Sequence, residues 1–147
     1  GTHSNMLGHL SECIAAFTKD LGPRMGKTLL LVQSEFGRTV QENGAQGTDH
    51  GAGGFMLAIS DMVKANPKGA GVVGQHKTLD NLKDNRYQMV TTDFRTVYCE
   101  ALERLFGFDP YKTRIFPSYT VRPAPRYRES AFGESIASGR HPSPSSK

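Results

Sequence analysis

The sequence predicts an α/β fold in which a sheet is flanked by helices and followed by a basic carboxyl-terminal tail. Two apolar runs, Thr28 to Gln33 and Phe55 to Ile59, are typical of strands, and a glycine-rich loop separates them. An amphipathic helical pattern precedes the first run, and another extends from Phe94 to Leu105. A helix followed by a buried strand is typical of an α/β unit.

The first helix is predicted to begin at Ser4 or Asn5, either of which can cap it, and to end at Gly22-Pro23. Its apolar residues recur at intervals of three and four, which places them in one stripe on one helical face. These residues are Leu7, Leu10, Ile14, Phe17 and Leu21. A short basic connection then leads into the first strand.

The first strand is predicted to be buried on both faces and stops abruptly at Ser34-Glu35. In open parallel sheets, ligands bind beyond the carboxyl ends of the strands, and Glu35 would lie at such an end. The loop from Phe36 to Gly54 is long for a compact domain, and loops of that length are usually functional or disordered. We therefore expect the chemistry of this protein to be located there.

The remaining patterns predict short strands at residues 71–74 and 87–90, then the last helix. Thr92-Asp93 offers a cap for this helix, and Gly107 ends it. Cys13 and Cys99 fall within helical apolar patterns without metal-type spacing, so we expect both to be buried thiols.

The net charge of +4 resides mainly in the tail. From Ser118 onward there are five basic and two acidic residues, which leaves the body with 13 basic and 12 acidic residues, close to neutral. A nucleic-acid-binding surface should carry its positive charge on the folded face, so we predict no nucleic-acid binding. We expect residues 1–117 to form a domain and residues 118–147 a flexible, disordered tail rich in Pro, Ser and Arg. No apolar run approaches the ~18 residues of a membrane span, so the chain is predicted to be soluble.

The most suggestive local group is Asp49-His50, which glycine-containing turns flank on both sides. Carboxylate and imidazole are both ligands for zinc and similar divalent ions, although an Asp-His pair also occurs in ordinary surface turns. Glu35 would be held rigidly after its strand. Arg38 is suited to gripping a planar oxyanion, or equally to pairing with Glu35. His3, on residue type and position alone, is expected to be a terminal, exposed residue.

A series of blocks in order along the chain resembles a known family. The blocks are Thr2-His3-Ser4-Asn5, Ser34-Glu35-Phe36-Gly37-Arg38, Glu42-Asn43-Gly44, Gly47-Thr48-Asp49-His50-Gly51, Gly71 to Gly74, and Thr91 to Tyr98. Together they resemble the carboxyl-terminal part of the domain of unknown function 1501 family, sulfatase-like proteins of the alkaline phosphatase superfamily. The resemblance covers about residues 2 to 110 and leaves out the tail.

The resemblance implies part of an alkaline-phosphatase-like sheet with a divalent-metal site, for zinc, manganese or calcium, at the ends of its strands. Such a metal neutralises a phosphate or sulfate ester and activates a nucleophile. It implies that His3, Glu35, Asp49 and His50 are metal ligands and that Arg38 contacts the oxygens of an anionic ester substrate. Family members often carry export signals, which suggests a periplasmic or extracytoplasmic setting.

Two departures qualify this expectation. The family's first block usually reads Trp-Asp-Thr-His, whereas this chain begins Gly1-Thr2-His3, and the superfamily's nucleophile lies in an amino-terminal half that this sequence lacks. We therefore expect a fragment of a metal-dependent hydrolase that is inactive alone. A sheet lacking half its strands exposes an edge, so it should require its amino-terminal half or a partner chain. The alternative is a non-catalytic binding or structural subunit that retains the fold.

Overall fold

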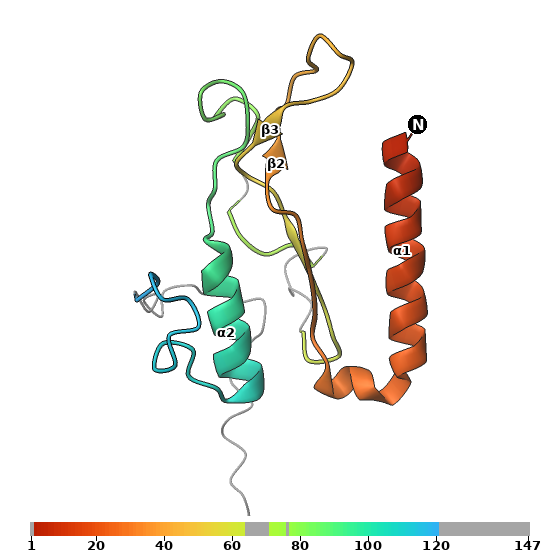
Figure 1. The fold of residues 1–147 in the computed structure, drawn as a ribbon, viewed down its shortest axis with the longest axis vertical. Coiled ribbons are helices and arrows are strands. Elements are labelled where there is room, and N and C mark those ends of the chain that lie inside the picture. The colour runs from red at the N-terminus through yellow and green to blue at the C-terminus, as the bar shows by residue number, and fades with distance from the viewer. Residues whose placement is uncertain (1, 64–70, 76, 121–147) are drawn as a thin grey trace, which may run out of the picture.

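The computed structural model describes residues 2–63, 71–75 and 77–120, which combine helices with short antiparallel strands (Figure 1). The α/β class predicted from the sequence is confirmed. The predicted tail falls outside the described residues from residue 121 onward. The elements are α1 (Thr2–Leu21), the 3-10 helix η1 (Gly22–Lys27), β1 (Leu30–Gln33), β2 (Gly37–Arg38), β3 (His50–Gly51), β4 (Met56–Ile59) and α2 (Phe94–Phe106).

The four strands form one long interrupted hairpin. β1 pairs antiparallel with β4, where Leu30 lies opposite Ile59, and β2 pairs antiparallel with β3, where Arg38 lies opposite His50. Between the two pairs, three residues on the first arm (34–36) face four on the second (52–55), as in a β-bulge. Both apolar runs contain strands, as predicted, but β1 is not buried on both faces: its first three residues are half-buried and Gln33 is exposed, because it pairs only with β4.

The parallel arrangement expected around Glu35 is wrong for the part of the chain that the structure describes. Parallel neighbours need a crossover of about a dozen residues or more, usually through a helix. The loop after β1 instead folds back on itself through β2 and β3, so β4 returns alongside β1 in the opposite direction. The hairpin tip lies at the end of the ribbon remote from η1 (Figure 1).

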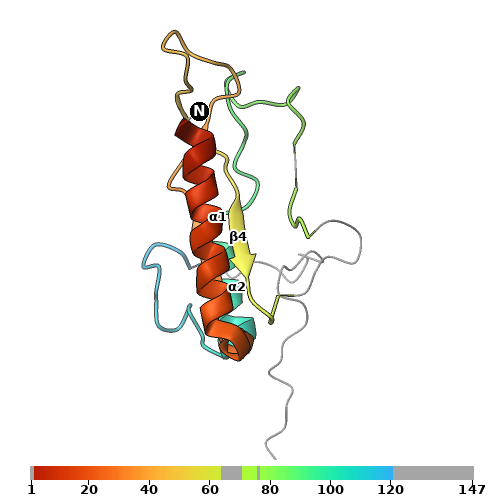
Figure 2. The ribbon, with the colours of Figure 1, turned by 90° about the vertical axis from the view of Figure 1, so that its right-hand side faces the viewer.

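The predicted helix is formed as α1, but it begins at Thr2, so Ser4 and Asn5 lie within it rather than capping it, and no residue of it is buried. Its apolar stripe is uncovered: the Leu7 and Phe17 side chains are 49% and 44% exposed. The helix runs alongside the β1–β4 ribbon and joins it through η1 (Figures 1 and 2). No described helix has the length and apolar character needed to cross a membrane. Cys13 is exposed rather than buried, because no described element covers this helix.

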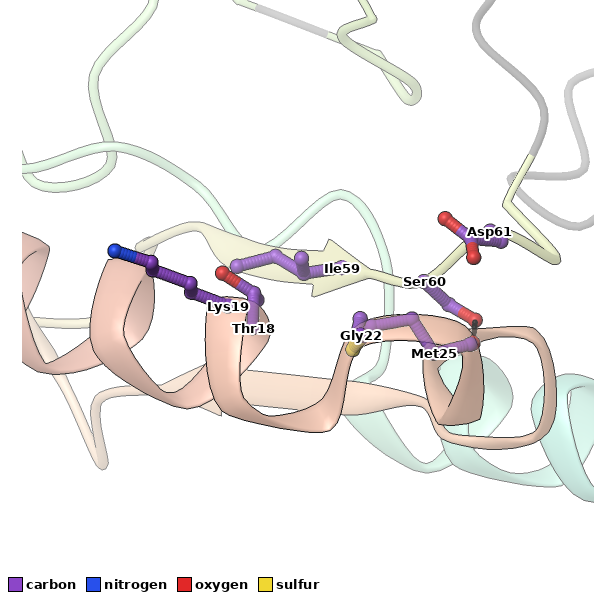
Figure 3. A pocket seen from close by; sticks show the side chains of 7 residues that line it. All are labelled: Thr18, Lys19, Gly22, Met25, Ile59, Ser60 and Asp61. Carbon is purple, nitrogen blue, oxygen red and sulfur yellow. Dashed lines mark hydrogen bonds between the residues drawn. The ribbon is translucent and has the colours of Figure 1, made fainter.

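The junction between η1 and the end of β4 fixes the base of the hairpin. Met25 is buried there, and its carbonyl oxygen accepts a hydrogen bond from the Ser60 hydroxyl at 3.1 Å (Figure 3). A cavity of about 480 Å³ adjoins this contact. Its lining residues are Thr18, Lys19, Gly22, Met25, Ile59, Ser60 and Asp61.

Helix α2 carries two of the five buried side chains among the described residues. It begins as predicted at the Asp93 cap, whose carboxylate accepts the backbone N–H of Arg95. It ends at Gly107, whose φ of 65° is in the left-handed region that favours glycine. Cys99 and Ala101 are buried on this helix, and Pro110 is buried in the segment that follows. Cys99 therefore meets the expectation of a buried thiol.

The short strands predicted at residues 71–74 and 87–90 are not formed. Gly71 and Gly74 have φ values of 79° and 118°, which take the backbone out of the β region. In the second segment only Tyr87 makes ladder contacts, as a partner in isolated bridges.

Glycines allow the hairpin arms and the segment around Gln88 to approach at backbone distance. A Cβ atom on Gly37 would overlap the Gly53 carbonyl oxygen. A Cβ atom on Gly53 would lie 2.6 Å from the Gln88 carbonyl oxygen, which accepts the Gly53 N–H at 2.9 Å. These positions therefore exclude any side chain.

Replacing Gly37 with alanine should destabilise the protein, because the new methyl group has no space beside Gly53. We expect the free energy of unfolding to fall by about 1–3 kcal/mol. Gly44→Ala is the matched control: it lies in the same loop with nothing within 4 Å of its Cβ position, and should change stability by less than about 0.5 kcal/mol. Urea unfolding followed by circular dichroism would measure both. Equal unfolding midpoints for the two variants would contradict the close packing.

The Asp93 cap should make the free energy of unfolding depend on pH in the acidic range. The hydrogen bond from the Arg95 guanidinium lowers the pKa of this carboxyl from its ordinary 3.8. The stabilisation that ionised Asp93 gives the folded state is therefore complete above pH 3.8. It is lost as the pH falls through the pKa of Asp93 in the folded state, which is lower than 3.8.

Asp93→Asn tests this dependence, because asparagine still caps the helix but cannot ionise. The stability difference between wild type and Asp93→Asn should shrink between about pH 4 and pH 2, while titration of the other carboxyl groups cancels in the comparison. Urea unfolding at several pH values would measure it. A difference that stays constant over this range would count against the Asp93–Arg95 interaction.

Candidate functional site

The hairpin tip brings three side chains onto one face. Arg38 and His50 lie directly opposite each other in the β2–β3 pair, and opposite residues of an antiparallel pair share a face. The His50 imidazole stacks on the Phe36 ring with 3.8 Å between ring centroids. The guanidinium carbon of Arg38 lies 5.1 Å from the centroid of the same ring. We call Phe36, Arg38 and His50 the Phe36 cluster.

The Arg38 guanidinium is exposed and anchored at one end. Its Nη1 atom donates to the Thr48 carbonyl oxygen at 2.9 Å, and the Phe36 ring supports it. The ion pair with Glu35 weighed above is not among the ion pairs found in residues 2–63, 71–75 and 77–120. A guanidinium carries five N–H donors, so Arg38 keeps donors for an oxyanion beyond its bond to Thr48.

Asp49 serves as a link between the hairpin tip and a distant segment. Its Oδ2 atom pairs with the Arg86 guanidinium at 2.9 Å, and its Oδ1 atom accepts from the Asn43 amide at 2.9 Å. Asn43 in turn accepts the backbone N–H groups of Ala45 and Gly47, which closes the loop. Both partners of the ion pair are about half exposed, so it contributes about 1 kcal/mol or less.

Arg86 is a site residue that the sequence does not reveal. It lies 37 residues from Asp49, next to a turn in which Asp84 and Asn85 have positive φ values. No local pattern marks it as a partner. The only signal is the turn chemistry of Asp84-Asn85, which predicts a reversal of the chain but not its neighbour.

The buried Thr39 hydroxyl ties the two arms together beneath the cluster. It accepts the backbone N–H of Asp49 at 3.0 Å and donates to the Gln41 carbonyl oxygen at 3.1 Å. The backbone N–H of Thr39 also donates to the Asp49 carbonyl oxygen at 3.0 Å. A buried hydroxyl with both a donor and an acceptor is fully satisfied, so it holds this part of the hairpin in one register.

The other two predicted ligands have different surroundings. Glu35 follows β1 as expected, and the Ser34 hydroxyl lies 3.5 Å from its carboxylate. Glu35 lines a groove with aromatic residues of the α2 region, which we call the Glu35 groove. Its lining residues are Gln33, Ser34, Glu35, Phe94, Tyr98 and Phe116. His3 lies in the first turn of α1 and is exposed. The structure thus unites Arg38, Asp49 and His50 at the hairpin tip, whereas Glu35 lies further down the same hairpin and His3 lies on α1.

The predicted ligands do not fit a complete metal centre. Within the described ranges, no three His, Cys, Asp or Glu side chains form a group that could hold a metal ion. Both carboxylate oxygens of Asp49 already accept bonds from Arg86 and Asn43. No catalytic step through a metal follows from these side chains.

Cys99 is not a suitable nucleophile. Burial raises the pKa of its thiol, which favours the neutral form, whereas the thiolate is the reactive species. It is buried on α2 and does not line the Glu35 groove.

A family model matches the greater part of the chain. A family model described as "Protein of unknown function (DUF1501)" matches residues 1–115, which include the whole hairpin, the Glu35 groove except Phe116, and α2. No curated protein and no solved structure matched the chain. Because the matched region covers most of the 147 residues, the chain belongs to the DUF1501 family of proteins of unknown function.

Proposed function

We propose that the Phe36 cluster binds the oxyanion of a phosphate or sulfate ester, and that this chain is part of a metal-dependent hydrolase of such esters. The observation that carries the proposal is the cross-strand pairing of Arg38 with His50. A guanidinium presents paired donors that match the oxygens of phosphate and sulfate. The His50 imidazole beside it adds a ring N–H donor on the same face.

The geometry supports this use because both polar groups are held before any ligand arrives. The Phe36 ring contacts the His50 imidazole and the Arg38 guanidinium, and the Thr48 carbonyl fixes one guanidinium nitrogen. Side chains that are already positioned lose less conformational entropy when they bind. An exposed, preorganised pair of this kind is suited to gripping an anionic group.

The proposal includes a divalent metal, zinc, manganese or calcium, shared with a further polypeptide. The predicted ligands His3, Glu35, Asp49 and His50 do not assemble a metal centre within the described structure, so further ligands would have to come from the amino-terminal half of the domain or from a partner chain. The uncovered apolar stripe of α1 supports such a partner, since helices of globular proteins usually bury such a stripe.

A non-catalytic binding subunit is the second candidate. The observation in its favour is the engagement of Asp49 by Arg86 and Asn43. A carboxylate held in this way braces the loop. In this alternative the Phe36 cluster would still bind an anion, but no hydrolysis would follow.

Titration of the chain with inorganic phosphate and inorganic sulfate, followed by isothermal calorimetry, tests anion binding. Arg38→Gln should weaken binding by about tenfold or more, because it removes a charge-assisted hydrogen bond. Arg24→Gln, which changes an exposed arginine on η1, is the matched control and should bind as wild type does. Equal affinities for wild type and Arg38→Gln would sink the proposal.

Hydrolysis assays separate the two candidates. With p-nitrophenyl phosphate and p-nitrophenyl sulfate, and added Zn²⁺, Mn²⁺ or Ca²⁺, the hydrolase reading predicts turnover once the completing polypeptide is present, and a loss of turnover in Arg38→Gln. Anion binding that depends on Arg38 without turnover of either ester in the completed assembly would favour the binding subunit.

A further inference from the structure

A groove of about 470 Å³ opens between the end of β1 and the start of α2. One wall consists of the polar residues Gln33, Ser34 and Glu35, and the other of three aromatic residues: Phe94, Tyr98 and Phe116. Neither Arg38 nor His50 lines it. The groove is therefore distinct from the Phe36 cluster, although its polar wall belongs to the same arm of the hairpin.

The aromatic wall is a corner of three mutually tilted rings. Their centroids lie 6.0–6.2 Å apart with interplanar angles of 67–89°, which is edge-to-face packing. Phe94 and Tyr98 are one helical turn apart and share a face of α2. Phe94 remains 46% exposed, so the aromatic wall is accessible to a ligand.

The polar wall carries a carboxylate without a cationic partner in the described part of the chain. Glu35 is exposed, and none of the ion pairs found there includes it. The cation at the start of α2, Arg95, is already engaged: it pairs with Asp93 at 2.6 Å and lies 4.6 Å from the Tyr119 ring centroid. Asp93 also caps the positive end of the helix.

A carboxylate and aromatic rings that line the same groove favour a cation that carries apolar groups. The faces of aromatic rings are electronegative and attract cations within about 6 Å, while their hydrocarbon surface favours methyl and methylene groups. A bare metal ion would gain nothing from the rings, and a neutral apolar ligand would leave Glu35 without a counter-ion. The two walls together specify both properties in one ligand.

We propose that this groove binds an alkylammonium cation, a positively charged nitrogen that carries methyl or methylene groups. Glu35 supplies the opposite charge, and Phe94, Tyr98 and Phe116 contact the apolar groups. The proposal uses no residue of the Phe36 cluster. It gives Glu35 an organic cation as its partner in place of a metal ion, so the metal of the proposed hydrolase would be held without Glu35.

Choline chloride is the test ligand, titrated into the full chain with EDTA present and followed by isothermal calorimetry. We expect saturable binding, and binding at least about tenfold weaker for 3,3-dimethylbutan-1-ol, the neutral molecule of the same shape. Comparable affinity for the two molecules would show that charge is not recognised. Loss of choline binding on addition of EDTA would show that a metal is required. Either result would overturn the proposal.

Two variants and a control locate the binding. Glu35→Gln keeps the side-chain shape but removes the charge, and Phe94→Leu removes one ring; each should weaken choline binding by about tenfold. Glu42→Gln changes an exposed carboxylate at the hairpin tip and should bind as wild type does. Circular dichroism would confirm that α2 is retained in Phe94→Leu. Wild-type affinity in Glu35→Gln would refute the assignment.

Choline occurs as a free cation and as a lipid headgroup, and a second experiment distinguishes these two sources. Co-sedimentation with phosphatidylcholine vesicles that is lost in Glu35→Gln would assign the headgroup. Choline binding without such co-sedimentation would assign the free cation. Absence of both would overturn the proposal.

Discussion

The close approach of backbone segments at the hairpin is the constraint on which the rest of the structure depends. Gly37 and Gly53 leave no room for a side chain between the arms, and Gly53 bonds directly to Gln88. The Val40 N–H donates to the Arg86 carbonyl oxygen at 2.9 Å. The segment from Arg86 to Gln88 therefore runs beside both arms of the hairpin. Because these bonds join backbone to backbone, the arms cannot slide without breaking several of them. The positions of the Phe36 cluster and of Arg86 beside Asp49 both follow from this arrangement.

The hairpin leaves much of the apolar stripe of helix α1 exposed. Most helical stability in proteins comes from packing an apolar face rather than from intrinsic propensity. Much of the stripe of α1 is exposed, and burying the remaining exposed half of a side chain such as Leu7 or Phe17 would contribute about 1 kcal/mol. This free energy would be gained by the partner polypeptide of the proposed function if it covered the stripe.

The features that could be predicted from the sequence are those that short stretches determine. The cap at Asp93, the left-handed Gly107 and the spacing between them define α2 without reference to other elements. Strand direction could not be predicted, because an apolar run reads the same in a parallel and an antiparallel pair. The burial of Cys13 was wrongly predicted, because a helical stripe shows which face is apolar but not whether anything covers it.

For Glu35 the sequence predicted the position after a strand correctly, but not the residues that surround the side chain. The carboxylate does follow a strand, but α2 and Phe116 supply its neighbours from at least 59 residues further along the chain. Phe36, the next residue, contacts His50 instead. These two consecutive residues of one arm therefore have different environments. Glu35 lines a groove with aromatic rings, whereas the Phe36 ring contacts a guanidinium and an imidazole. If both proposals hold, the two sites bind ligands of opposite charge, and a ligand bound at one site leaves the other available.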